Sequence, residues 1–178
     1  FSEPNIEFVE GYIELLDGVA DSSVDFVTTN CVLNLSPDKG LVIDEVLRVL
    51  KPGGQFVVAD VFADRRLPAK LAEHSLYPEL LGECLGGALY HHDFRRLFKQ
   101  REIEDVRQLH APRLFSVPDR YRSALGAAKF YSRTYSAFKL PLEDLCEDFA
   151  QGVIYRGTIP QAPEAFELDA GHRFETGK

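Results

Sequence analysis

The sequence has no methionine and no tryptophan, and its 178 residues include only three cysteines. Three is an odd number, so these cysteines do not form a disulfide framework, and a cytoplasm that keeps thiols reduced is the simplest location. The chain also begins at Phe1, within what should be a connection leading into a strand. Together with the missing initiator methionine, this start predicts that an N-terminal segment of the protein precedes the given sequence.

Long apolar runs and an excess of positive charge are lacking as well. No run of 18 apolar residues occurs and no signal peptide is visible, so no membrane span is predicted. The net charge is −8, which argues against a nucleic-acid binder and favours a neutral or cationic small substrate. With 45% apolar residues, the chain is long enough for one sizeable domain with its own core.

The stretch from Val24 to Val61 predicts a strand, a helix and a second strand. VDFV at Val24–Val27 is apolar and β-rich, which is typical of a buried strand of a parallel sheet rather than an exposed edge. Ser36-Pro37-Asp38 supplies a cap, a first-turn proline and an acidic residue for a helix start, and Lys51–Gly54 ends that helix. Gln55–Val61 is then a second buried strand, so we expect a right-handed βαβ unit.

Ligands of open parallel sheets bind beyond the carboxyl ends of the strands. The first strand of this unit delivers Asn30 and Cys31 to that edge, and the second delivers Asp60. His91 and His92 are less persuasive as metal ligands, because adjacent residues do not share a helix face and no third ligand follows at a ligand spacing.

Periodicity and turn residues predict further elements along the chain. They are a strand at Asn5–Val9, a helical stretch at Pro68–Leu81 interrupted at Pro78, an amphipathic helix at His91–Lys99, a strand within Glu104–Pro112, a short helix at Pro118–Ala128, a strand at Phe130–Leu140 that completes the sheet as its antiparallel edge, and a strand at Gly152–Tyr155.

Several motifs resemble those of known methyltransferases. VDFVTTN followed by RVLKPGGQFVVAD is similar to the fourth and fifth core strands of class I S-adenosylmethionine-dependent methyltransferases. NCVLNLSPDK at Asn30–Lys39 and GECLGGALY at Gly82–Tyr90 resemble the two central cysteine motifs of the arsenite methyltransferase family. FVEGYIELL at Phe8–Leu16, FYSRTYSAFKLP at Phe130–Pro141 and the tail from Cys146 to Lys178 are similar to that family too.

The resemblance implies an α/β, Rossmann-like class I methyltransferase sheet, mostly parallel with an antiparallel edge strand, and a small C-terminal extension. Residues 1–140 would be the C-terminal part of the methyltransferase domain, and residues 141–178 the extension. The glycine-rich loop and the acidic ribose-binding residue of the family are absent, as is a third, upstream family cysteine. Ala128 stands where some members carry a further cysteine, and Cys146 is assigned a structural role.

The same resemblance implies that S-adenosylmethionine is the cofactor. Gly11, Tyr12 and Ile13 would lie against its adenine, and Asn30 would contact cofactor or substrate. Composition alone favours an ordinary strand-to-helix turn for the first three residues. For Asn30 a capping or loop role is an equal alternative.

Cys31 and Cys84 are the implied catalytic residues and the implied ligands of trivalent arsenic, because soft ions prefer thiolates. Only the fold can bring together two residues so far apart in sequence, and a buried structural thiol is the alternative for Cys84. The arsenic lone pair attacks the methyl group, so no strong general base is required. The implied partners are trivalent arsenic as a thiol conjugate and a thiol reductant, without nucleic acid or membrane.

Two other functions remain open. The first is methyl transfer to another small molecule, such as a quinone precursor, with coincidental cysteines. The second is metalloid binding without catalysis, if the missing cofactor-binding part does not exist.

Overall fold

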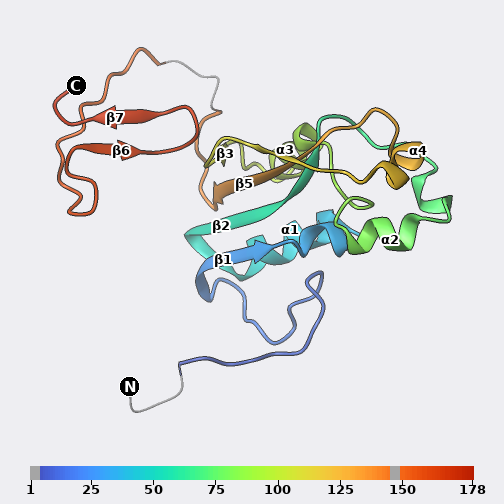
Figure 1. The fold of residues 1–178 in the computed structure, drawn as a ribbon. Helices are drawn as coiled ribbons and strands as arrows, with labels where there is room; N and C mark the ends of the chain where they lie inside the picture. Colours follow the sequence, from blue (N-terminus) through green and yellow to red (C-terminus); the bar gives the residue numbers. More distant parts are fainter. Residues whose placement is uncertain (1–4, 145–148) are drawn as a thin grey trace.

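The computed structural model describes residues 5–144 and 149–178, which form a five-stranded sheet, helices around it and a separate two-stranded hairpin (Figure 1). The elements are β1 (Val24–Asn30), η1 (Leu33–Leu35), α1 (Lys39–Val49), β2 (Leu50–Ala63), η2 (Leu71–Glu73), α2 (Tyr77–Gly82), α3 (His91–Lys99), β3 (Val106–Gln108), β4 (Arg113–Phe115), η3 (Asp119–Tyr121), α4 (Arg122–Leu125), β5 (Phe130–Phe138), β6 (Ala165–Glu167) and β7 (Arg173–Glu175).

The strand order of the large sheet is β1-β2-β5-β3, with β4 also pairing with β5. β1 and β2 are parallel, whereas β5 is antiparallel to β2, β3 and β4, so four strands run one way and β5 runs the other. The predicted α/β sheet of mostly parallel strands is therefore confirmed. The predicted place of the antiparallel strand is wrong: β5 lies inside the sheet, because β3 and β4 cover the side of β5 that faces away from β2.

The predicted βαβ unit is present, with a different helix cap. Asp38 is the N-cap of α1, and its carboxylate accepts hydrogen bonds from the N–H groups of Gly40 and Leu41 at 2.9 and 3.1 Å. The Ser36 hydroxyl instead accepts from the Asp38 N–H at 3.2 Å. The helix ends before Leu50, where the backbone turns directly into β2.

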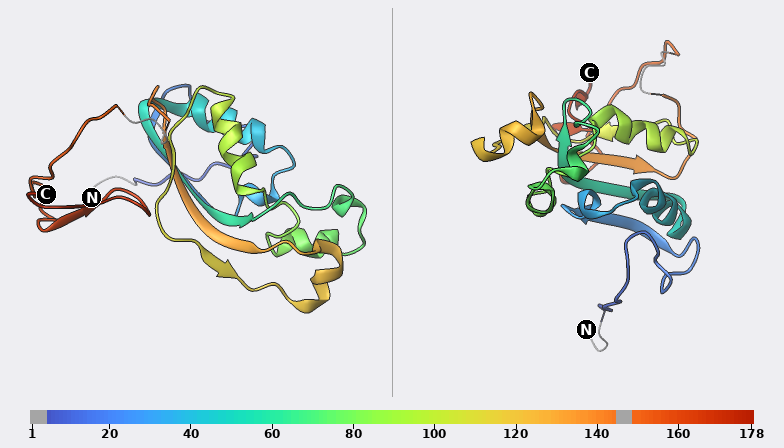
Figure 2. Two further views of the ribbon diagram at one scale, coloured as in Figure 1. Left: turned by 90° about the horizontal axis from the view of Figure 1, so that it is seen from above. Right: turned by 90° about the vertical axis from the view of Figure 1, so that its right-hand side faces the viewer.

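The core consists of two apolar clusters. One lies between the sheet and the helices α1 and α3, which pack on the same face of it (Figure 2). The other joins the far end of β2 to α2 and α4. The site described below lies where the two clusters meet, because β2 contributes buried residues to both.

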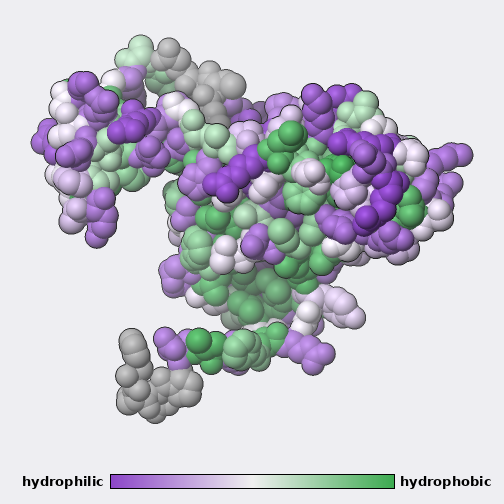
Figure 3. Space-filling view, in the orientation of Figure 1, coloured by the Kyte–Doolittle hydropathy of each residue, from purple (hydrophilic) through white to green (hydrophobic). Residues whose placement is uncertain are grey.

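Two sequence predictions fail along the first edge of the sheet. β1 is an edge strand of the described sheet rather than a buried one, and Phe26 is 52% exposed. Asn5–Val9 forms no strand, and Phe8 is 95% exposed. Strands need a ladder partner, and no segment of the described residues supplies one on this side. Hydrophobic residues accordingly gather near β1 on the face shown in Figure 3.

Other predictions differ in detail. Pro78 does not interrupt a helix, because it lies in the first turn of α2, where proline is tolerated. Glu104–Pro112 contains only the three residues of β3, and Pro118–Ala128 contains η3 and α4. Gly152–Tyr155 is not a strand, while the hairpin of β6 and β7 was not predicted. Within the described ranges, every helix is too short or too polar to cross a bilayer.

Candidate thiolate site

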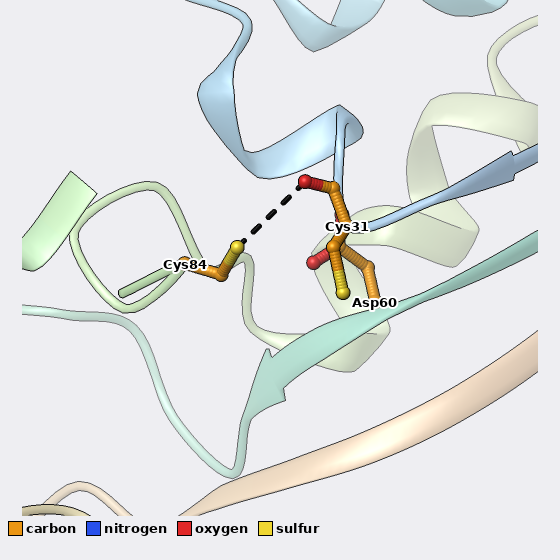
Figure 4. A group of neighbouring side chains, drawn as sticks. All are labelled: Cys31, Asp60 and Cys84. Atoms are coloured by element: carbon orange, nitrogen blue, oxygen red, sulfur yellow. Dashed lines mark hydrogen bonds between the residues drawn. The ribbon is translucent and has the colours of Figure 1, made fainter. Parts of the chain in front are cut away.

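Cys31 and Cys84 meet at the carboxyl edge of β1 and β2, although 53 positions separate them in sequence. Cys31 directly follows β1, and Cys84 lies in the turn after α2. Their Sγ atoms and a carboxylate oxygen of Asp60 all lie within 4.8 Å of one another, and the Cys84 Sγ is 3.7 Å from the Cys31 carbonyl oxygen (Figure 4). The predicted proximity of the two sulfurs is thus present, while their role stays a prediction.

Both cysteines have an uncommon backbone conformation. The φ angle is +55° at Cys31 and +58° at Cys84, in the left-handed region that L-residues other than Asn and Asp rarely adopt. Such positions persist only where the surrounding structure stabilises them, and they are frequent at binding sites. In both places the chain leaves a regular element abruptly, and the turn brings the two side chains toward each other.

Asn34 connects the two cysteine segments. Its Nδ2 group donates to the Asp60 Oδ1 at 2.7 Å, to the Val61 carbonyl at 2.7 Å and to the Cys84 carbonyl at 3.1 Å. Its own backbone lies three positions after Cys31 and donates to the Asp60 Oδ2 at 3.1 Å. Asn34 is only 1% exposed. This single buried side chain therefore joins β2 to the loop that carries Cys84.

Asp60 lies near both sulfurs, but its acceptor capacity is already used by the protein. Its Oδ1 accepts from Asn34 Nδ2 and from the Val61 N–H, and its Oδ2 accepts from the Asn34 N–H. The backbone of Leu33 is a further donor to the same carboxylate. Burial raises the Asp60 pKa, and these hydrogen bonds together with the Lys39 charge oppose that rise. We infer that Asp60 organises the segment after β1 and is not a third ligand.

Gly87 lets the loop after α2 lie directly on this segment. A Cβ atom at Gly87 would be 1.9 Å from the Asn34 carbonyl oxygen, so no larger residue fits without displacing one of the two backbones. Glycine at this position thus permits the close approach of the Cys84 loop to the Asn34 backbone. Asn34 itself was missed, because one asparagine among leucines has the pattern of an ordinary loop residue.

The Cys84 thiol is held in its protonated form. Burial, followed by the negative charge of Asp60 and by the neighbouring Cys31, raises the pKa of Cys84 to about 11. A thiol must lose its proton to become a ligand. Because the groups around Cys84 do not stabilise the negative thiolate, a bound, positively polarised atom has to stabilise it. The arrangement therefore suits a strongly thiophilic, positively polarised atom held between the two sulfurs.

The predicted cofactor-binding residues do not all come together. Gly11, Tyr12 and Ile13 contribute to a hollow of about 340 Å³ that residues 9–13 and 15–19 line. Tyr12 is 80% exposed, while Ile13 packs against the core. Asn30 is exposed at the end of β1 and does not line this hollow. The cofactor roles of all four residues stay predictions.

The remaining candidates fall outside this site. Cys146 lies outside the residues that the structure describes. Among those described, the cysteine, histidine and carboxylate groups that come close enough to hold a metal ion are Cys31, Asp60 and Cys84, without His91 or His92.

Comparisons with known proteins identify what the whole chain resembles. A family model described as a methyltransferase domain matches residues 1–102. Arsenite methyltransferases of Aquipseudomonas alcaligenes and Mus musculus are 48% and 36% identical over the full chain, which covers 51% and 46% of their lengths. A crystal structure of an arsenic (III) S-adenosylmethionine methyltransferase from Chlamydomonas reinhardtii superimposes with a TM-score of 0.86 at 48% identity, over 99% of this chain and 59% of that one. The chain thus spans about half the length of the curated relatives it matches.

Proposed function

The chain belongs to the methyltransferase-domain family, and from this premise we propose that its protein transfers a methyl group from S-adenosylmethionine to trivalent arsenic held by Cys31 and Cys84. The observation that carries the proposal is the meeting of two remote sulfurs within 4.8 Å at the ligand-binding edge of the sheet. The names of the similar arsenite methyltransferases support the same substrate. We further propose that residues 1–140 are the later part of the methyltransferase domain and residues 141–178 an extension.

Arsenic enters this site by thiol exchange. Each cysteine thiol replaces a thiolate of an arsenic–thiol conjugate, so that a cysteine–arsenic bond forms and the displaced thiolate leaves with the cysteine proton. No separate base is then needed to ionise Cys84, in spite of its raised pKa. This exchange is the reason for proposing a thiol conjugate as the substrate form and the cytoplasm, where free thiols persist, as the location.

The bound arsenic keeps one lone pair for the chemical step. When bound, S-adenosylmethionine supplies a methyl carbon activated by its sulfonium. The two cysteines hold arsenic in one orientation, and Asn34 keeps their loops in register, so the chain contributes proximity and orientation. The arsenic lone pair would become the new carbon–arsenic bond while the carbon–sulfonium bond breaks, its electron pair staying on the departing thioether sulfur. Arsenic would thereby be formally oxidised by two electrons. A thiol reductant has to return those electrons before another methyl group is added.

Part of the cofactor contact falls within this chain. The hollow lined by residues 9–13 and 15–19 has apolar side chains, including Ile13 and Leu16. Its backbone is held to α1 by the Leu16 N–H, which donates to Glu45 Oε2 at 2.9 Å. An apolar surface of this size fits a flat aromatic base such as adenine. Gly11, Tyr12 and Ile13 are therefore proposed for adenine contact and Asn30 for the edge nearest the methyl group.

A metalloid-binding module without catalysis is the second candidate function. The observation that favours it is that both sulfurs and the residues that hold them lie in this chain, whereas only one part of a cofactor site does. This reading predicts arsenite binding without methyl transfer.

Two measurements separate these functions. Arsenite binding is measured by equilibrium dialysis, and transfer of a labelled methyl group from S-adenosylmethionine to arsenite is measured on the complete protein. We expect Cys31→Ser and Cys84→Ser each to abolish both, and Cys146→Ser, the matched control, to retain both. Binding without transfer would support the second candidate. Full turnover by Cys31→Ser or Cys84→Ser would refute the role of that thiol.

A further inference from the structure

A second hollow, of about 280 Å³, lies away from the cysteines, between α3, β3, β5 and the loop that precedes β7. Most of its charged lining is basic. The arginine and histidine residues that line it are His91, Arg95, Arg107, Arg133 and His172. In a chain with a net charge of −8, the gathering of three arginines, Arg95, Arg107 and Arg133, in one hollow differs from the overall composition.

Part of this lining is neutralised within the protein. Arg107 pairs with Asp105 at 2.8 Å and with Asp169 at 3.2 Å, and His172 lies 2.8 Å from Asp169. The Ala170 N–H also donates to the Gln108 carbonyl at 3.0 Å. These contacts fasten the loop before β7 to β3 and form one side of the hollow.

Arg95 and Arg133 differ from Arg107 in having no carboxylate partner among the described side chains. The Arg133 guanidinium donates to Gln108 Oε1, a neutral acceptor, and its Cζ lies 5.2 Å from the centre of the Tyr131 ring. The Arg133 Nε is buried without any hydrogen-bond acceptor. A buried donor without a partner is uncommon in native structures, and a bound ion or water is among the features that account for such a group.

Arg95 and Arg133 line the hollow together with His91. Burial, followed by the charges of Arg133, His92 and Arg95, lowers the pKa of His91 to about 4. Two positive charges thus converge on one small volume, where arginine would bind a carboxylate or phosphate through paired N–H groups.

We propose that this cationic hollow binds the oxyanion group of a small molecule, a carboxylate or a phosphate, with Arg95 and Arg133 as its charge partners. At about 280 Å³ the hollow is slightly smaller than the range of about 300–1,000 Å³ for ligand pockets, which favours a compact anion over a nucleotide. The proposal does not depend on arsenic chemistry, because none of its residues belongs to the thiolate site.

The protein is titrated with inorganic phosphate at constant ionic strength, and binding is measured from the NMR chemical shifts of the backbone amides. A second arm uses succinate, so that the two arms distinguish a phosphate from a carboxylate ligand. We expect saturable shifts in residues 105–108 and 169–172 with one or both anions. Arg133→Gln should weaken binding about ten-fold or more, since it removes a charged hydrogen-bonding partner.

Arg96→Gln is the matched control. Arg96 lies next to Arg95 on α3, but it pairs with Asp93 at 2.5 Å and does not line the hollow, so binding should be unchanged. Arg133→Lys, which keeps the charge, should retain part of the affinity, and near-UV circular dichroism verifies the fold of each variant. Linear shifts with both anions, or equal binding by Arg133→Gln and Arg96→Gln, would overturn the proposal.

Discussion

The replacement of Asn34 by alanine tests whether one buried amide holds the two cysteine segments together. It removes three hydrogen bonds from Nδ2, to the Asp60 carboxylate and to the carbonyls of Val61 and Cys84. A neutral hydrogen bond contributes about 1 kcal/mol and one to a charged group about 1.5–3 kcal/mol. The NH2 group has two hydrogens, so the three acceptors share two full hydrogen bonds. The expected loss of unfolding free energy is therefore about 2.5–4 kcal/mol, from one neutral bond and one bond to a charged group.

The same substitution should weaken arsenite binding more than global destabilisation explains. Once the Cys84 carbonyl is released, the loop can move, and the second sulfur is no longer held beside the first. Urea unfolding followed by circular dichroism measures stability, and equilibrium dialysis under conditions where the variant is folded measures arsenite affinity. Gln100→Ala, which removes an exposed amide after α3, is the control and should change neither quantity.

The reasoning about Asn34 is refuted by either of two results. A stability change below about 1 kcal/mol would mean that the three hydrogen bonds contribute little in context. Unchanged arsenite affinity in a clearly destabilised variant would mean that the sulfur spacing is set by other contacts.

Three further predictions concern neighbouring features. Gly87→Ala should reduce arsenite affinity, because its methyl group would displace the backbone of Asn34, whereas Gly82→Ala, with no atom within 4 Å of the added carbon, should not; dialysis of both variants decides this. The pKa of Cys84 in the folded protein, about 11, lies above its ordinary value of 9.0. The stability that this group contributes should therefore be fully present below pH 9 and be lost as the pH rises through 11. Urea midpoints of the native protein and Cys84→Ser should converge between pH 8 and 11, and a constant difference would contradict the assignment. Asp38→Ala should cost about 1 kcal/mol in urea unfolding, since it removes the N-cap of α1, and an unchanged midpoint would count against the cap.

Local signals predicted the centre of the fold. The strand at Gln55–Val61 and the helix before it follow from apolar periodicity, whereas Lys51–Gly54, predicted to end the helix, lies inside β2. Such signals act over a few residues, so they are readable without neighbours. They could not tell that Val24–Val27 lies at an edge or that β5 lies inside the sheet, because both facts depend on which other strands are present.

Some features of the candidate site could likewise be predicted from the sequence, and others depend on the tertiary structure. The sequence by itself determined that cysteines follow a strand and a helical stretch, and its motifs resemble those of arsenite methyltransferases. Only the tertiary structure decided that Cys31 and Cys84 lie together, that Asn34 joins their loops and that Asp60 is fully engaged by protein donors. Contacts between residues 53 positions apart have no local periodicity, since they arise from the packing of whole elements against one another.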